Sequence, residues 1–163
     1  LTVLSERIYR IEDTDDDGVA EWARSLGAEV VRVDGPGLNR AVKTGVAALG
    51  EAGFDRVVVA HADLPRARRL DHCAATGGIT LVPDRHLDGT PVLVVPPDAG
   101  FRFAYGPASY AAHVAEAERL GRTGVAWRSL HDPDLAWDVD DPADLEGADL
   151  EGTGLAGTVQ SAG

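Results

Sequence analysis

The chain has 163 residues and a formal net charge of −12, with 27 acidic and 15 basic residues. This balance argues against a nucleic-acid backbone or an anionic membrane as the main partner, because both need clustered Lys and Arg. Cys73 is the only cysteine, which excludes an internal disulfide and a cysteine-rich metal site. The sequence shows no membrane-length apolar run and no secretory signal, so we expect a cytoplasmic protein.

Strand and helix patterns alternate along the chain, which predicts a three-layer α/β domain over residues 1–146 with a mostly parallel mixed sheet. Apolar alternation and β-branched runs predict strands, and 3.6-residue periodicity predicts helices. Residues 147–163 are Gly-rich without a period, so we expect a disordered tail. The expected strands are residues 7–11, 28–33, 56–61, 78–82, 91–95 and 124–127, and the expected helices are 18–26, 38–49, 109–120 and one that starts at Asp141.

Asp63 directly follows the strongest predicted strand and precedes Leu64-Pro65. Open α/β sheets bind ligands outside the carboxyl ends of their strands, so this position favours chemistry. A carboxylate there can hold Mg²⁺, which prefers hard oxygen ligands and usually shares them with substrate phosphates. In the alternative interpretation, Asp63 caps a helix that Pro65 opens.

A second acidic segment runs over residues 138–142, Asp-Val-Asp-Asp-Pro. Alternation in an extended segment puts Asp138 and Asp140 on the same side, whereas Asp141 before a proline suits a helix N-cap. Close carboxylates repel one another unless a cation lies among them. We therefore expect a metal ion between Asp63 and either Asp138 or Asp140.

A rival metal site is residues 13–18, which match the opening of an EF-hand loop. The glutamate that such a loop needs at its twelfth position would fall on Arg24, a cation. The segment is better interpreted as a polar loop whose carboxylates favour the start of the next helix.

Two glycine-containing turns open predicted helices, and backbone amides at such turns can meet an anionic ligand. The first turn contains Gly37 and Asn39, and the second contains Gly106 and Ser109, with Ser109 also a candidate N-cap. Arg102 could add charge-assisted hydrogen bonds to a phosphate or carboxylate. The five histidines have no metal-binding spacing, and His113 suits either packing or function.

An ordered set of segments resembles the 2-phospho-L-lactate or phosphoenolpyruvate guanylyltransferases of coenzyme F420 biosynthesis over roughly residues 7–146. Each segment is short, and the order of the whole set carries the resemblance. The segments are residues 62–65 (ADLP), 83–85 (PDR), 88–90 (DGT), 101–103 (FRF), 105–109 (YGPAS), His113, 116–117 (EA) and 138–145 (DVDDPADL), together with Gly37-Leu38-Asn39 and Ala41.

The resemblance implies a Rossmann-like nucleotidyltransferase fold of the nucleotide-diphospho-sugar transferase type. It implies a catalytic Asp63 and Asp140 that carry Mg²⁺, with Asp138 as the alternative ligand to Asp140. It implies that GMP from GTP is joined to phospholactate or phosphoenolpyruvate with release of pyrophosphate. Thr90, Gly106, Ser109 and Arg102 would bind the three-carbon phosphate acid, and Gly37 and Asn39 would lie on the guanosine side.

The chain departs from the family pattern at two places. The match starts at the family's second strand, so the first strand, basic phosphate loop and helix are not seen, and Pro91 interrupts the run after Thr90. Two alternative functions stay open. One is a nucleotidyltransferase with a molybdopterin or sugar phosphate acceptor, and the other, motivated by the missing unit, is a non-catalytic binding or partner subunit. Three explanations of the missing unit stay open: the sequence is a fragment or starts at the wrong place, the unit comes from another chain in a homodimer or a complex with a partner, or the protein is a degenerate homologue that binds without catalysing.

Overall fold

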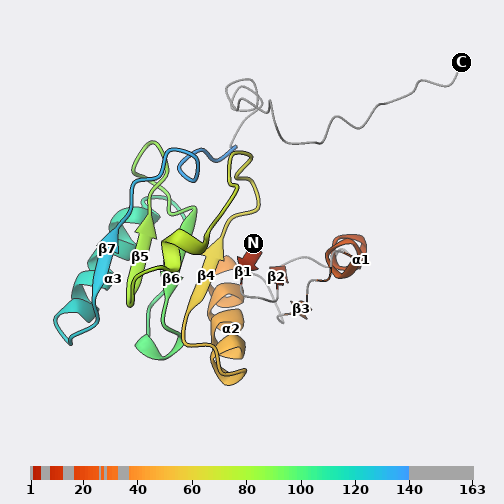
Figure 1. Ribbon diagram of the computed structural model, residues 1–163, viewed down its shortest axis with the longest axis horizontal. Helices are drawn as coiled ribbons and strands as arrows, with labels where there is room; N and C mark the ends of the chain where they lie inside the picture. The colour runs from red at the N-terminus through yellow and green to blue at the C-terminus, as the bar shows by residue number, and fades with distance from the viewer. Residues whose placement is uncertain are drawn as a thin grey trace, which may run out of the picture.

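The computed structural model describes residues 2–4, 8–12, 17–25, 27, 29–32 and 37–139 (Figure 1). The described residues form a seven-stranded sheet in the order β3-β2-β1-β4-β6-β5-β7. The strands are β1 (Thr2–Leu4), β2 (Ile8–Glu12), β3 (Glu29–Arg32), β4 (Val57–Ala60), β5 (Ile79–Val82), β6 (Val92–Val95) and β7 (Trp127–Ser129).

The α/β class and the mixed sheet are confirmed, but fewer strand pairs are parallel than expected. Of the strand pairs among the described residues, β2–β3 and β5–β7 are parallel, and β1–β2, β1–β4, β4–β6 and β5–β6 are antiparallel. Residues 83–91 connect β5 to β6, which is shorter than the crossover of a dozen or more residues that a parallel pair needs. β1 occupies the position between β2 and β4.

Two long helices cover one face of the sheet. They are α2 (Leu38–Glu51) and α3 (Ser109–Gly121), and a shorter helix, α1 (Asp17–Ser25), connects β2 to β3. Apolar side chains of α2 and α3 pack on alternate residues of the central strands. These buried side chains include Val42, Leu49, Val57, Val59, Ile79, Leu81, Leu93, Val95, Ala117 and Leu120.

The opposite face is covered by residues 64–74, which include the 3₁₀ helix η1 (Asp71–Ala74), and by Leu135. Leu64 and Leu70 pack there with Cys73. Residues 64–74 contain no α-helix, so the alternative interpretation of Asp63, as the cap of a helix opened by Pro65, is wrong. Asp141 and residues 147–163 lie outside the described residues.

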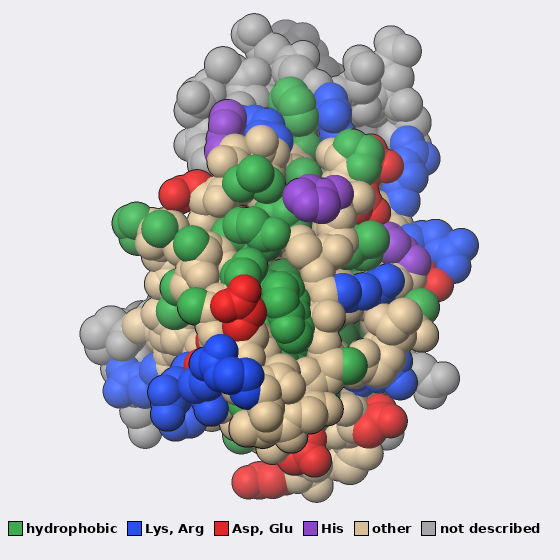
Figure 2. All heavy atoms as spheres, turned by 90° about the vertical axis from the view of Figure 1, so that its left-hand side faces the viewer, with side chains coloured by type: hydrophobic (Ala, Val, Ile, Leu, Met, Phe, Trp, Pro, Cys, Tyr) green, Lys and Arg blue, Asp and Glu red, His purple; other side chains and the backbone are tan. Residues whose placement is uncertain are grey.

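Six strands and three helices match the predicted elements to within a few residues. β7 is the largest shift, because the amides of Gly124 and Val125 donate hydrogen bonds to Gly121 and Leu120 at the end of α3. The strand therefore starts at Trp127 rather than at residue 124. β7 is an edge strand, and Figure 2 shows hydrophobic side chains near the middle of this side of the molecule, with charged side chains around and among them. No described helix is long and apolar enough to cross a bilayer.

Candidate functional site

Several loops meet at one edge of the sheet, beyond the carboxyl ends of β4, β5 and β7. The register pairs Ala60 with Val92, Val82 with Val92, and Leu81 with Ser129, so these strand ends are level with one another. Residues 61–65, 83–91 and 130–139 continue from this edge, and the last of these segments runs along the top of the sheet in Figure 1. This is the edge where open α/β sheets bind ligands.

The acidic segment around Asp63 and the start of the one over residues 138–142 meet at this edge, as the sequence predicted. The backbone amide of Val139 donates a hydrogen bond of 3.1 Å to the carbonyl oxygen of Asp63. The side chain of Asp63 is 47% exposed, and its Oδ1 lies 4.0 Å from Nδ1 of His61. The carboxylate of Asp138, the next residue back from Val139, is 12% exposed. Asp140, the favoured metal ligand in the sequence, lies outside the described residues.

Two carboxylates from different segments are a donor set that suits Mg²⁺, which is commonly held by one or two carboxylates plus substrate phosphates. Among the described residues, no group of three or more His, Cys, Asp or Glu side chains could hold a metal ion. A metal site built from the described residues alone is therefore the open, two-carboxylate kind. Residues 13–16 of the rival EF-hand match are outside the described part of the chain.

Two arginines lie beside the acidic segments, and sequence reasoning gave neither a role. The guanidinium carbons of Arg66 and Arg85 lie 4.0 Å and 4.6 Å from the centre of the Trp137 ring. Arg85 also donates from Nη1 to the carbonyl oxygen of Asp138 at 2.9 Å. Both arginines line a pocket of about 400 Å³ together with Trp137. The sequence does not indicate that these three side chains meet, and the fold brings them together.

The loop after β5 is organised by the buried carboxylate of Asp84. It accepts hydrogen bonds from the amides of His86 at 2.8 Å and Asp88 at 3.0 Å, and from the amide of Gly89. A Cβ atom at Gly89 would lie 2.6 Å from Oδ2 of Asp84, so the loop needs a glycine there. Asp88 in turn accepts at its carbonyl oxygen from the amide of Tyr110 at 2.8 Å. The loop therefore joins the site edge to the first turn of α3.

Thr90 was predicted to contact substrate, but in this structure its side chain is fully buried. Its Oγ1 lies 3.0 Å from Nδ1 of His113, which is buried too. Nε2 of His113 accepts a hydrogen bond of 2.9 Å from the amide of Ala104, so Nδ1 carries the proton and donates it to Thr90. Burial lowers the pKa of His113 to about 4 and keeps the ring neutral. Here Thr90 orients His113 and faces the protein interior.

The start of α3 exposes Gly106, whose φ of 135° favours glycine. Ser109 is the first helical residue and is buried, and its amide donates 3.1 Å to the carbonyl oxygen of Gly106. The N-cap is Ala108, with left-handed backbone, so the interpretation of Ser109 as the N-cap is wrong. The side chain of Arg102 is exposed, while its amide donates 3.0 Å to Glu116. Gly106 and Arg102 thus remain accessible candidates for an anion.

The start of α2 is tied to the same loop. Gly37 is exposed and is the N-cap, with a φ of 129°. The side chain of Asn39 donates to the carbonyl oxygen of Tyr105 at 3.0 Å and accepts from its amide at 2.6 Å. Both polar ends of the amide are therefore used within the protein. Asn39 aligns the two helix starts, and any guanosine contact would have to compete with Tyr105.

The ring of Tyr105 fills the space between the strand end and α3. Its centre lies 5.5 Å from that of His61 and 4.8 Å from that of His113. The phenol is deeply buried, which raises its pKa well above its usual value. Its hydroxyl has no hydrogen-bond partner among the described residues. The residue therefore acts as an aromatic spacer behind the site.

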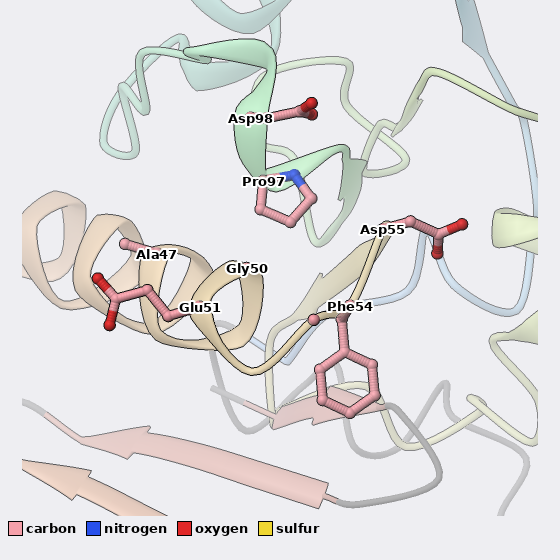
Figure 3. A pocket seen from close by; sticks show the side chains of 8 residues that line it. Ala47, Gly50, Glu51, Phe54, Asp55, Pro97 and Asp98 are labelled. Atoms are coloured by element: carbon pink, nitrogen blue, oxygen red, sulfur yellow. The ribbon is translucent and has the colours of Figure 1, made fainter.

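A second acidic region lies at the other end of the sheet and is a poor match to an anionic ligand. A pocket of about 670 Å³ lies between the end of α2, residues 53–55 and the 3₁₀ helix η2 (Pro97–Ala99) (Figure 3). Its lining includes Glu51, Asp55 and Asp98 but neither Lys nor Arg. Asp55 precedes β4 whereas Asp63 follows it, so the pocket is remote from the carboxyl edge.

Cys73 is buried and poorly suited to act as a nucleophile, although His72 and Asp132 lie beside it. Nε2 of His72 is 2.8 Å from Asp132 and 3.7 Å from Sγ of Cys73, so a single ring nitrogen faces both partners. Burial raises the pKa of Cys73 to about 11, which leaves almost no thiolate at neutral pH. The cluster is structural.

The fold is similar to the crystal structure of a protein assigned as a nucleotide-diphospho-sugar transferase from Desulfovibrio desulfuricans G20. The TM-score is 0.60 at 20% identity, over 84% of this chain and 62% of that one. Residues 7–158 match the family described as "Guanylyl transferase CofC like", and the chain belongs to this family.

Curated relatives named phosphoenolpyruvate guanylyltransferase agree with this membership. The one from Sphaerobacter thermophilus is 36% identical over 136 residues, which is 80% of this chain and 64% of the relative. The one from Rubrobacter xylanophilus is 35% identical over 136 residues, with 80% and 65% covered. The one from Thermomonospora curvata is 38% identical over 145 residues, with 83% and 60% covered. The chain thus spans less than two thirds of the length of these relatives.

Proposed function

We propose that the protein transfers a guanylyl group from GTP to a three-carbon phosphate acid, phosphoenolpyruvate or 2-phospho-L-lactate, in coenzyme F420 biosynthesis. A phosphate oxygen of the acid attacks the α-phosphorus of GTP, a new phosphoanhydride bond forms, and the bond to the β-phosphate breaks. Pyrophosphate leaves with the bonding electron pair. The names of the relatives and the family membership support the reaction class.

The observation that carries the proposal is the hydrogen bond from Val139 to Asp63. It brings two segments far apart in the sequence to the carboxyl edge of β4, with the carboxylates of Asp63 and Asp138 on adjoining backbone. We assign Mg²⁺ to Asp63 and Asp138, with Asp140 as a further ligand. When bound, the ion would neutralise phosphate charge and polarise the α-phosphoryl group.

The remaining residues bind and orient the two substrates. Arg66 and Arg85 lie near the acidic segments and supply positive charge close to the phosphates of a nucleotide. Gly106 and Arg102, with the buried Ser109 and Thr90 behind them, form the side of the site that binds the three-carbon phosphate acid. Gly37 and Asn39 form the nucleoside side through the start of α2. Little covalent chemistry falls to the protein, so positioning and charge neutralisation account for the rate.

The test is pyrophosphate release by the full chain with GTP, Mg²⁺ and either acid. We expect release that needs an acceptor, that is greater with GTP than with CTP or UTP, and that is lost in Asp63→Asn. Asp98→Asn, in the pocket of Figure 3, is the matched control and should keep full activity. Greater release with CTP or UTP would favour another nucleotidyltransferase. Binding of GTP without release of pyrophosphate, whichever acceptor is added, would favour a non-catalytic subunit.

A further inference from the structure

Arg85 contacts residues 136–138, which lead into the second acidic segment, at several points. Its amide donates 2.9 Å to the carbonyl oxygen of Ala136, and its guanidinium donates 2.9 Å to the carbonyl oxygen of Asp138. The same guanidinium lies over the ring of Trp137. The side chain and the amide of Arg85 thus contact three successive residues, Ala136, Trp137 and Asp138.

The loop that carries Arg85 is itself fixed. The neighbouring carboxylate of Asp84 is buried and accepts hydrogen bonds from three amides of the same loop. The side chain of Arg85 is only 24% exposed. Arg85 therefore projects from a rigid turn at the end of β5 onto a segment without regular secondary structure, residues 130–139.

The guanidinium holds the main chain of Asp138 more closely than its carboxylate. Nη1 is within hydrogen-bond distance of the carbonyl oxygen, but it lies 3.6 Å from Oδ1, which is beyond that distance. Arg85 can thus keep its hydrogen bond to the backbone while the carboxylate turns toward a cation.

We propose that Arg85 is a positioning residue that fixes Asp138 beside Asp63 so that the two carboxylates bind one divalent cation. This inference rests on the proposed function, because it presupposes a cation at this pair. The residues fit such an ion: both carboxylates offer hard oxygen donors, and Val139 bonds to the backbone of Asp63. Partners that orient a metal ligand typically change metal affinity about 10–100-fold when they are lost.

Arg85 acts on a bound cation in two opposing ways, and two substitutions separate them. Its positive charge repels the cation, whereas its hydrogen bonds and ring contact hold the ligand in place. Arg85→Lys keeps the charge but lacks the planar fork that spans a carbonyl oxygen and lies flat on a ring. Arg85→Met removes both effects. If charge dominated, the lysine variant would bind like the wild type and the methionine variant more tightly.

The experiment measures Mn²⁺ binding to the full chain by electron paramagnetic resonance of the free ion, with Mg²⁺ as competitor. We expect both Arg85→Lys and Arg85→Met to weaken Mn²⁺ binding by about 10-fold or more. The matched control is Arg128→Lys. Arg128 also donates to two backbone carbonyls, those of His72 and Cys73, but it holds η1 rather than the acidic segment. Its variant should keep wild-type affinity even where its melting temperature falls.

Different results would overturn the role of Arg85 and the metal assignment. Wild-type affinity in the Arg85→Lys variant, or tighter binding in the Arg85→Met variant, overturns the role of Arg85 while the metal site stands. An equal loss in Arg128→Lys shows a general effect of destabilisation and overturns it as well. If the wild-type protein binds no Mn²⁺, or if the Asp63→Asn variant binds Mn²⁺ with wild-type affinity, the metal assignment of the proposed function is overturned. The role of Arg85 is then overturned with it.

Discussion

His113 donates the proton on Nδ1 to the hydroxyl of Thr90, and both side chains are completely buried. The pair connects α3, which contains His113, to Thr90, which lies two residues before β6. The other ring nitrogen accepts a hydrogen bond from the amide of Ala104. The ring can therefore make both hydrogen bonds only in its neutral form. A predicted substrate contact thus belongs to a buried polar network.

The first prediction concerns pH. The pKa of His113 is lowered to about 4 in the folded protein by burial, against a usual value near 6.5. Between these values the unfolded chain binds the extra proton, so the free energy of unfolding falls as pH falls from about 6.5 to 4. The slope from this residue approaches about 1.4 kcal/mol per pH unit. Urea unfolding across this range should show it.

Substitution isolates this contribution. His113→Gln should lower stability at neutral pH yet flatten the slope between pH 6.5 and 4. His86→Gln, at an exposed histidine, should leave the slope unchanged. An unaltered slope in the His113 variant would contradict a neutral, buried ring.

The second prediction tests the link between the two helix starts. Asn39→Leu removes both hydrogen bonds to the backbone of Tyr105 and leaves a partly buried amide and carbonyl unpaired. We expect a loss of about 2 kcal/mol in the free energy of unfolding. Lys43→Leu, at an exposed position of the same helix, should change it little. Equal stability of the two variants would show that the Asn39 bonds are not formed in solution.

The third prediction uses two tyrosines with opposite surroundings. The buried hydroxyl of Tyr105 has no partner in the described part of the chain, so Tyr105→Phe should stabilise the protein by about 1 kcal/mol. The hydroxyl of Tyr110 lies 2.8 Å from Oγ of Ser129, so Tyr110→Phe should destabilise it by a similar amount. Thermal unfolding of the pair measures the difference. A fall in stability in both variants would indicate a partner for Tyr105.

The fourth prediction concerns the turn after β5. Gly89→Ala would place a methyl group 2.6 Å from the carboxylate of Asp84, which must shift and weaken its amide hydrogen bonds. Such overpacking costs typically about 1–3 kcal/mol. Gly77→Ala is the control, because a Cβ there meets nothing within 4 Å. Denaturant midpoints of the two variants should differ clearly, and identical midpoints would show a loose turn.

The fifth prediction addresses the carboxylate pair. Asp63→Asn and Asp138→Asn should each weaken Mn²⁺ binding by more than the roughly 10–100-fold that loss of an orienting partner costs. Pyrophosphate release should fall in parallel, because both depend on the same ion. Asp63 is half exposed, so its variant should fold normally. Full activity together with weakened Mn²⁺ binding would show that the reaction does not depend on a cation at this pair.

Much of the fold was predictable because its signals are local. Residues 56–61 form a β-branched run, and the structure has β4 at Val57–Ala60. The 3.6-residue pattern of residues 38–49 is α2 with two further residues. Strand direction was less accessible, although the short link between β5 and β6 already implies an antiparallel pair. The pairing of β1 with both β2 and β4 has no signal in its three residues.

The site was predictable where strand ends mark it and not where side chains converge on it. The proximity of residue 63 to residue 139 follows from the rule for strand ends. The contacts of Arg85 do not, since they depend on how a loop after β5 meets a segment after β7. The same holds for Asn39, whose partner is the backbone of a distant residue. An interaction with main-chain atoms carries no sequence signature on the partner's side.

Residues 130–139 leave β7 at the edge of the sheet and reach Asp63 at the end of β4, passing two intervening strands (Figure 1). The distance that residues 130–139 must span before Val139 can reach Asp63 is therefore set by the combined width of β5 and β6. A substitution in the core that shifts β7 relative to β4 would alter cation affinity from a distance. Cation affinity at Asp63 and Asp138 would then be a sensitive measure of how well that half of the sheet is assembled.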